Sequence, residues 1–274
     1  MIQLTPEQLR ELQFVELEIL IEIDRICKKN HIRYSLTGGT LLGAVRHGGF
    51  IPWDDDADVS MLRSEYRKFQ KACKTDLDKS RFYFQDIDNT PGYRWGYGKV
   101  RRKDSLFLRE HQEDMPYEQG VFVDVFPRDA VPDNKVLRKM HSFACYCVRK
   151  SMWSAVGRKV SQGRIMRLWY TIVYALTKNN IAKIYHFLIK ISSNKKTEYV
   201  RALTFPLPNK QIGYKREWYR QYDKIAFEGY RFQVEKSYLE WLKSEFGDYM
   251  SLPPVGKRKT HPVSKIKLPE RKNV

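Results

Sequence analysis

Cysteine is scarce in this chain, and its few positions form no recognisable site. The 274 residues include four cysteines, and no two of them stand in a CxxC pair. Cys145 and Cys147 are two positions apart, and helical neighbours at that spacing face away from each other, which favours core thiols over metal ligands. Neither a structural zinc site nor a disulfide framework is therefore expected, and reduced cytoplasm is the simplest compartment.

The chain also lacks the apolar segments that direct a protein into or across a membrane. The N-terminal sequence MIQLTPEQL has no basic region followed by an apolar one, so no signal peptide is expected. The apolar segment at residues 168–176 is far shorter than the ~20 residues that a bilayer-spanning helix needs. These absences favour a cytoplasmic protein.

Acidic residues are absent from one long segment. Residues 134–197 contain 14 lysines and arginines and no acid, in a chain whose net charge is +18. Residues 257–274 contain 7 basic residues and 1 acid, whereas the remainder of the chain is close to neutral. The positive charge is thus confined to two places, which indicates a localised anionic partner.

Residues 134–197 also carry apolar side chains at helical spacing, which predicts amphipathic helices. Such helices can form a cap on the core or a peripheral contact with an anionic membrane surface. The complete lack of acids favours the membrane surface, because packing alone does not explain it.

Residues 34–61 concentrate glycine and aspartate. Gly38 and Gly39 follow a predicted strand and precede a helix predicted over residues 41–46, which Thr40 can cap. Backbone amides at a helix start of this kind suit a phosphate group. A phosphate-binding turn is therefore expected at these glycines.

Four aspartates occupy five positions at residues 54–58. In an extended strand, Asp54, Asp56 and Asp58 share one face. Carboxylates so close raise one another's pKa values unless a cation lies between them, and their oxygens suit Mg²⁺ or Mn²⁺. Alone, such a run is more often a solvated acidic turn, but the glycine turn just upstream favours a metal site.

Another carboxylate interrupts an apolar strand. Residues 121–126 are nearly all apolar, and Asp124 lies in the middle, where burial is costly unless the carboxylate is paired or bound to a metal. Asp129 lies two positions after Pro127 and is expected to be a turn or cap residue. Thr5 and Gln8 predict a capping box at the start of the N-terminal helix, which is expected to pack on the sheet and to carry no chemistry.

Two further elements are predicted from local sequence. Residues 82–85 predict a strand, and residues 225–234 predict a hairpin that turns at Glu228 and Gly229.

These motifs resemble the LicD family, which belongs to the nucleotidyltransferase superfamily. The matching sequences are LTGGTLLGAVRHGGFIPWDDDADV, YGKVRRKDS, GVFVDVFPRD and FGDYMSLPP. With this resemblance we expect an α/β (α+β) fold with a nucleotidyltransferase-like mixed sheet, flanking helices and a basic helical insertion. The expected parts are a catalytic core at 1–132, the insertion at 133–205, and a C-terminal part at 206–274 that completes the core.

The resemblance implies a metal-dependent phosphotransferase. Such enzymes move a phosphorylated alcohol, typically phosphocholine, from a CDP-linked donor to a cell-surface glycan such as teichoic acid, lipopolysaccharide or capsule. CDP-choline is the expected donor, an anionic glycan or glycolipid is the expected acceptor, and the inner face of the membrane is the expected location.

Two alternatives stay open. A nucleotidyltransferase that uses a nucleoside triphosphate would share the same acids, but it would release pyrophosphate. A non-catalytic basic protein that binds membranes or nucleic acid belongs to another class. The gathering of acids in one predicted pocket argues against that class, and no RNA-binding motif is visible, so no nucleic-acid partner is expected.

The resemblance also implies roles for individual residues. The expected catalytic residues are Asp54, Asp56, Asp58 and Asp124. Of these, Asp56, Asp58 and Asp124 would hold Mg²⁺ or Mn²⁺, with a hydrogen-bonded structural aspartate as the alternative for Asp124. The expected substrate-binding residues are Gly38, Gly39, Thr40, Arg46, His47, Lys99, Arg101, Lys257, Arg258 and His261.

The basic residues each have a second interpretation. Strand alternation places Lys99 and Arg101 on one face with Tyr97, either facing the donor phosphates or on a charged edge strand. Arg46 and His47 either contact phosphate or end a helix favourably. The three tail residues at 257, 258 and 261 either bind phosphate or belong to a disordered basic tail.

Overall fold

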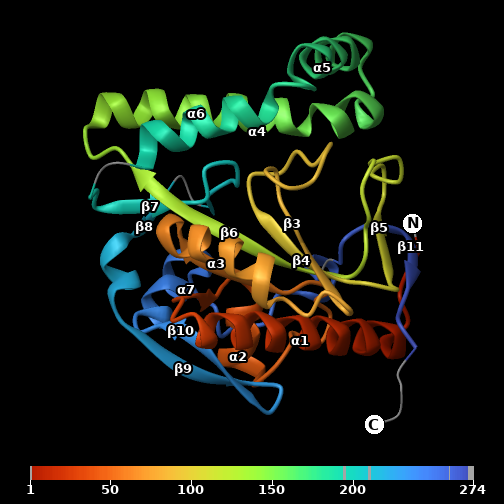
Figure 1. The fold of residues 1–274 in the computed structure, drawn as a ribbon, viewed down its shortest axis with the longest axis vertical. Helices are drawn as coiled ribbons and strands as arrows, with labels where there is room; N and C mark the ends of the chain where they lie inside the picture. Colours follow the sequence, from red (N-terminus) through yellow and green to blue (C-terminus); the bar gives the residue numbers. More distant parts are fainter. Residues whose placement is uncertain (1, 194–195, 209–210, 259, 271–274) are drawn as a thin grey trace.

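A mixed sheet with helices around it forms the body of the protein (Figure 1). The computed structural model describes residues 2–193, 196–208, 211–258 and 260–270. The strands run in the order β1 (Ser35–Leu36), β2 (Asp58–Leu62), β6 (Phe122–Val131), β4 (Gly98–Arg102) and β3 (Phe82–Gln85). β2 and β6 are parallel, and the other neighbours are antiparallel. The expected α/β (α+β) class is confirmed.

β6 is the central strand, and every residue in it is buried. Its apolar run is typical of a strand that is covered on both faces. The register places Asp124 opposite Asp58 of β2 on one side and opposite Lys99 of β4 on the other. Beyond the predicted end at residue 126, β6 continues to Val131, where β7 (Tyr199–Arg201) and β8 (Tyr214–Lys215) extend the sheet.

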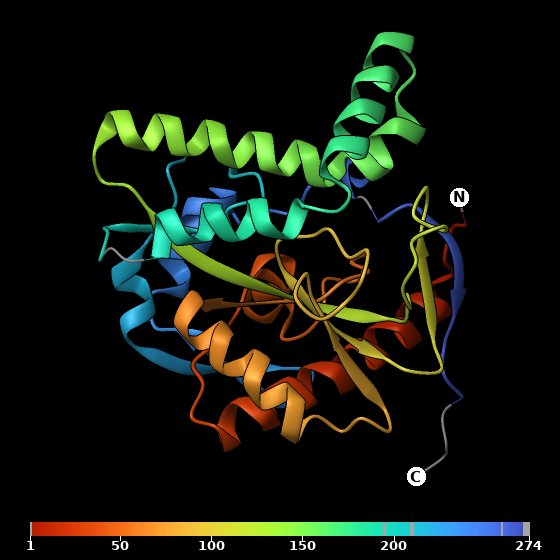
Figure 2. The same cartoon turned by 45° about the horizontal axis from the view of Figure 1, so that its top comes forward.

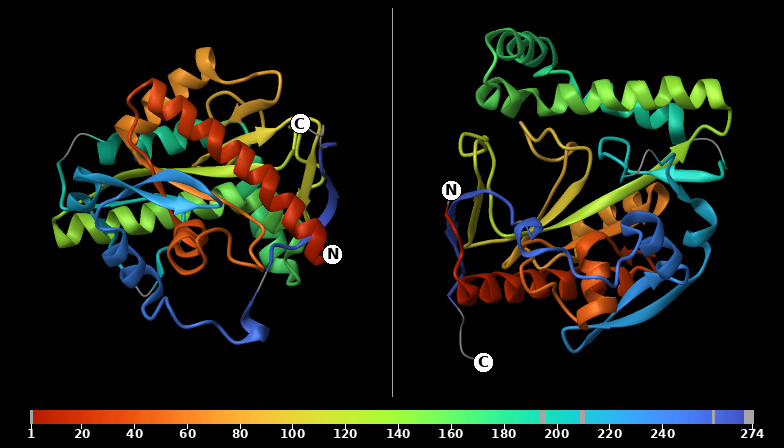
Figure 3. Two further views of the ribbon diagram at one scale, coloured as in Figure 1. Left: turned by 90° about the horizontal axis from the view of Figure 1, so that it is seen from below. Right: turned by 180° about the vertical axis from the view of Figure 1, so that it is seen from behind.

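Two helices, α1 (Pro6–Lys29) and α3 (Arg63–Asp76), pack against each other and against the sheet. The start of α1 has the predicted capping box, since Thr5 N–H donates to Gln8 Oε1 at 3.1 Å and Gln8 N–H donates to Thr5 Oγ1 at 3.2 Å. Seen from behind, α1 and the layer of α4 lie on opposite sides of the sheet (Figure 3).

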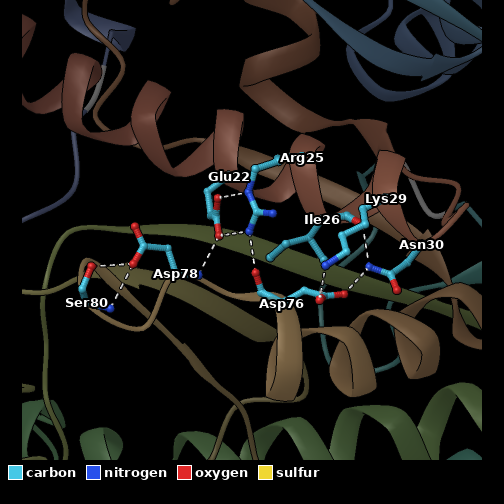
Figure 4. A network of polar contacts seen from close by, with 8 residues as sticks. All are labelled: Glu22, Arg25, Ile26, Lys29, Asn30, Asp76, Asp78 and Ser80. Carbon is cyan, nitrogen blue, oxygen red and sulfur yellow. Dashed lines mark hydrogen bonds and ion pairs between the residues drawn. The ribbon is translucent and has the colours of Figure 1, made fainter.

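A polar network joins the C-terminal ends of α1 and α3 (Figure 4). The Glu22 carboxylate accepts hydrogen bonds from Arg25 Nε at 2.7 Å and from the backbone N–H of Asp78 at 2.8 Å. Lys29 Nζ donates to Asp76 Oδ1 at 2.6 Å. These contacts hold the loop before β3 against α1 and stabilise the packing of the two helices on the sheet.

Three helices form a separate layer: α4 (Lys135–Val160), α5 (Arg164–Thr177) and α6 (Ile181–Ser193). The buried side chains between α4 and α6 form a second apolar core, which includes Cys145, Met152 and Tyr185. α5 packs on α4 and projects from the end of the layer (Figure 2). No helix in the described part of the chain is long and apolar enough to cross a membrane.

The C-terminal part packs back onto the core. A hairpin of β9 (Tyr222–Phe227) and β10 (Tyr230–Glu235) turns at Glu228 and Gly229, whose φ angles are +50° and +80°, as the sequence predicted. After α7 (Tyr238–Phe246), strand β11 (Val263–Lys267) pairs with β5 (Leu106–Arg109). The alternative of a disordered tail is therefore wrong for Val263–Lys267.

Asp129 lies within β6, which contradicts the prediction of a turn or cap residue after Pro127. Its carboxylate accepts hydrogen bonds from Arg63 at 2.7 and 2.6 Å, and its side chain is fully buried. The same guanidinium donates to the Tyr185 hydroxyl at 3.0 Å. This ion pair therefore connects α3, the central strand and the helical layer.

We expect Asp129→Ala to lower the free energy of unfolding by about 3–5 kcal/mol, because the Arg63 cation would be left buried without its partner. Urea denaturation measures the change. The matched control is Asp88→Ala, which removes an exposed pair with His186 and should cost less than about 1 kcal/mol. Equal losses in the two variants would contradict a stabilising role for the buried pair.

Candidate active site

Two carboxylates and one ammonium group lie side by side on three strands at the centre of the sheet. Asp58 begins β2, Asp124 is opposite it on β6, and Lys99 is opposite Asp124 on β4. Lys99 Nζ and Asp124 Oδ1 form an ion pair, and each side chain is only 5% exposed. The cost of burying Asp124 is thus offset by a charged partner, as the apolar strand required.

Asp58 is held in place but is not fully paired. Its backbone N–H donates to Thr40 Oγ1 at 2.8 Å. Its Oδ1 is buried and has no hydrogen-bond partner among the described residues. Burial, followed by the charges of Asp56 and Asp124, raises the pKa of the Asp58 carboxyl well above its usual range. An oxygen in this position lacks a cation or a donor.

The start of α2 (Gly38–His47) is pressed against the acids. Gly38 has a φ of +61°, and a Cβ there would lie 2.8 Å from Asp58 Oδ2. A Cβ at Gly39 would overlap Asp54 Oδ2. At Gly38 both the positive φ and the close approach favour glycine, whereas at Gly39 only the close approach does.

The helix α2 begins three residues earlier than predicted, so Thr40 is not its cap. The residue before the helix is Thr37, whose side chain makes no capping bond. Thr40 is buried, and its hydroxyl accepts the Asp58 N–H instead. The glycines therefore supply the first turn, whose backbone N–H groups have no partner within the helix.

The cluster contains a further carboxyl that the sequence analysis missed. Glu16 of α1 is buried, and its Oε2 has no hydrogen-bond partner in the described part of the chain. Burial, then the charges of Asp56 and its acidic neighbours, raises the pKa of Glu16 well above its usual range. Burial and Asp56 likewise raise the pKa of Asp54 to about 8. The expectation that the first helix carries no chemistry overlooked an acid between two buried apolar positions.

Asp56 faces two basic groups. Its Oδ2 lies 3.8 Å from Arg109 Nη2 and 3.6 Å from His261 Nδ1. Burial raises the pKa of Asp56, and these two groups oppose the rise. The adjacent Asp55, which was expected on the other face, accepts the backbone N–H of His261 at 2.9 Å and lies 3.0 Å from its Nδ1. Asp55 therefore holds the C-terminal segment against the acids.

A small pocket of about 70 Å³ next to Asp124 combines cations with aromatic rings. Lys99, Arg101 and Arg109 line it and gather around the ring of Phe122, with Lys99 Nζ 3.3 Å from the ring centroid. Burial lowers the pKa of Lys99 to about 7, although Asp124 opposes the change. Positive charge concentrated in a partly dry pocket is suited to a bound anion.

The pocket confirms the predicted common face of Lys99, Arg101 and Tyr97, all of which line it. Its lining also includes residues that the sequence analysis did not assign to a site, among them Arg109 and Trp153. Arg109 ends the short strand β5, and Trp153 comes from α4, with its ring 6.0 Å from that of Trp95. Alternation in β5 could have drawn attention to Arg109, but nothing local points from Trp153 to this pocket.

Four predicted residues lie away from the acids. Arg46 and His47 are at the end of α2 opposite the glycines, where Arg46 donates to two carbonyls of the segment after α7 at 3.0 and 3.3 Å. The Arg258 guanidinium stacks 4.3 Å from the centre of the Trp53 ring, and Lys257 is exposed. Arg46 thus fastens the C-terminal segment to α2, and Arg258 fastens it to Trp53 in the loop after that helix. Contact of the four residues with phosphate stays a prediction.

The available ligand atoms are of the type that a hard divalent cation prefers. Asp56, Asp58 and Asp124 offer carboxylate oxygens, and one buried oxygen of Asp58 has no partner among the described residues. Within the described ranges, however, no three His, Cys, Asp or Glu side chains already form a group that could hold a metal ion. Asp124 is engaged by Lys99, and Asp56 faces Arg109 and His261.

Comparison with known proteins identifies the family of the chain. A family model described as the LicD/FKTN/FKRP nucleotidyltransferase domain matches residues 31–150. Lipopolysaccharide cholinephosphotransferase LicD of Haemophilus influenzae is 31% identical over 262 residues, which cover 92% of this chain and 95% of that protein. An uncharacterized protein of Rickettsia typhi is 41% identical over 124 residues, or 43% of this chain and 36% of that protein.

A shorter similarity joins the chain to a human enzyme. Ribitol 5-phosphate transferase FKRP of Homo sapiens is 60% identical over 30 residues, which cover 11% of this chain and 6% of that protein.

We expect Gly39→Ala to displace the Asp54 carboxylate and to lower turnover by about 10-fold or more, with about 1–3 kcal/mol lost from the free energy of unfolding. Steady-state kinetics and urea denaturation measure the two effects. Gly256→Ala is the control, since a Cβ there meets nothing within 4 Å. Unchanged turnover in Gly39→Ala would show that the close approach of the helix to Asp54 is not needed.

Proposed function

Since the chain belongs to the LicD family and is a phosphotransferase of LicD type, we propose that it transfers phosphocholine from CDP-choline to a cell-surface glycan, with Mg²⁺ or Mn²⁺ as cofactor. The observation that carries the proposal is the row of Asp58, Asp124 and Lys99 on adjacent strands, beside a cationic pocket. Opposite charges side by side support a site for a diphosphate and its counter-ion.

The cationic pocket supports the binding of the donor diphosphate. Lys99, Arg101 and Arg109 line one small space. Asp124 pairs with Lys99 and Asp56 faces Arg109, so these carboxylates offset two of the three positive charges. The backbone N–H groups of Gly38 and Gly39 add donors at the start of a helix, a place that favours phosphate. The donor would thus lie between the helix start and the pocket.

The chemistry follows from these positions. When bound, a divalent cation at Asp56, Asp58 and Asp124 would neutralise the diphosphate. The acceptor hydroxyl oxygen attacks the phosphorus of phosphocholine, and the bond from that phosphorus to the bridging oxygen of CMP breaks. The hydroxyl proton passes to Asp54 or to one aspartate of the triad, and Lys99 and Arg101 offset the charge of the departing CMP.

We also propose that residues 133–205 form an insertion that contacts the inner face of an anionic membrane, where a glycan or glycolipid acceptor such as a teichoic acid, lipopolysaccharide or capsule precursor would lie. Most of the large apolar side chains that are exposed in the described residues lie on α4, α5 and α6. These helices contain no acid. Exposed apolar groups among basic residues support binding at a lipid surface.

The donor and the metal are tested with the full-length protein, CDP-choline and a glycan extract. We expect CMP release that requires Mg²⁺ or Mn²⁺ and falls by about 100-fold or more in Asp56→Asn. Asp88→Asn, at an exposed carboxylate, should keep full turnover. Release of pyrophosphate from CTP, without turnover of CDP-choline, would instead identify a nucleotidyltransferase.

The membrane contact is tested by flotation with liposomes. We expect the protein to bind vesicles that contain phosphatidylglycerol and to be released when the lysines and arginines of 134–197 are replaced by glutamine, because the attraction is mainly electrostatic. Vesicles of pure phosphatidylcholine are the control. Equal binding of both proteins to the anionic vesicles would refute the proposed contact.

A further inference from the structure

We propose that the helical layer contains a binding site for one hydrocarbon chain, in the cavity between α4 and α6. The cavity has a volume of about 270 Å³ and lies where the end of β6 meets the two helices. Its lining includes Leu137, Met140, Ala144, Leu188, Ile191 and Ala130. The further claim that this hydrocarbon chain belongs to a lipid-linked glycan rests on the proposed function.

The polar side chains at this cavity are engaged by other groups of the protein, which favours an apolar ligand over a polar one. His141 and Ser192 are both buried and hydrogen-bond each other at 2.7 Å. Thr197 donates its hydroxyl to the carbonyl of Tyr199 at 2.9 Å. The remaining lining is aliphatic apart from a proline. Cavities of this kind bind apolar groups in preference to water.

The cavity opens onto the apolar surface of the layer. Met140 at its rim is 65% exposed, and Ile191 is 49% exposed. Arg138 and Lys139 stand beside this rim in the sequence, and no acid occurs anywhere in 134–197. A chain attached to an anionic head group therefore matches both features, the apolar cavity and its cationic surroundings.

The position of the cavity relative to the acids favours a glycolipid over a small substrate. Ala130 at the cavity and Asp124 at the acids lie six residues apart on β6. At ~3.3 Å per residue in a strand, the two places are ~20 Å apart. A molecule that fills the cavity and also reaches the acids needs a spacer of several sugar units between its hydrocarbon chain and its reacting hydroxyl.

Decyl phosphate, kept below its micelle concentration, is a direct probe of the site. Isothermal titration calorimetry with the full-length protein should show saturable binding of one molecule per chain. Inorganic phosphate should not displace it, whereas decyl maltoside should compete, because both amphiphiles have the same chain. Displacement by inorganic phosphate alone, or the absence of saturable binding, would overturn the proposal.

A matched pair of variants separates the cavity from the general surface. Met140 lines the cavity, whereas Phe143 is equally exposed on the same helix at 68% and does not line it. Met140→Glu should weaken decyl phosphate binding at least 10-fold, and Phe143→Glu should change it less than 2-fold. Equal weakening in both variants, or none in Met140→Glu, would overturn the site.

Two further measurements keep this inference apart from the proposed function and from other occupants. If the protein turns over CDP-choline with a lipid-free glycan but does not bind decyl phosphate, only the hydrocarbon-chain site is rejected. Saturable binding without turnover would reject only the proposed function. Sedimentation analysis that shows a dimer, abolished by both Met140→Glu and Phe143→Glu, would assign this face to a second copy of the chain and overturn the proposal.

Discussion

Repulsion between buried carboxylates is the constraint on which the rest of this structure depends. The parallel register of β2 and β6 places Asp58 beside Asp124, and Glu16 of α1 adds another buried acid to the cluster. Lys99 and Arg109 offset part of this charge from β4 and β5. The Asp58 oxygen that lacks a partner among the described residues shows that the balance is incomplete. A positive group that binds to the unpaired carboxylate oxygen would stabilise this cluster. We therefore propose that a divalent cation binds here.

The parts of the chain far from the acidic motif are arranged to close this site. Asp55 holds His261 by its backbone and its ring, and β11 pairs with β5, the strand that ends at Arg109. Trp153 of α4 lines the cationic pocket from the helical layer. The candidate site is thus assembled from the N-terminal helix, the sheet, the helical layer and the C-terminal segment. The side chains that reach it from outside the acidic motif are those of Glu16, Arg109, Trp153 and His261.

The features that could be predicted from the sequence are local or belong to a recognised pattern. The capping box of α1, the strand β3 and the turn at Glu228 depend on nearby residues and were predicted correctly. The common face of Lys99 and Arg101 followed from strand alternation. The errors have long-range causes. The hydroxyl of Thr40 in α2 accepts the backbone N–H of Asp58 in β2. Asp129 lies in β6, where it forms a buried ion pair with Arg63 of α3. Glu16 reaches the site only through tertiary packing, which no local pattern reveals.

The proposed cation site is tested most directly by electron paramagnetic resonance of Mn²⁺ with the full-length protein and CDP-choline. Asp58→Asn removes a carboxylate that has an unsatisfied oxygen, whereas Asp55→Asn changes a carboxylate already engaged by His261. We expect the wild-type protein and Asp55→Asn to bind Mn²⁺, and Asp58→Asn to lose binding at least 10-fold while it keeps its fold. Equal Mn²⁺ affinity in the wild-type protein and Asp58→Asn would contradict the assignment of the acidic cluster as a metal site.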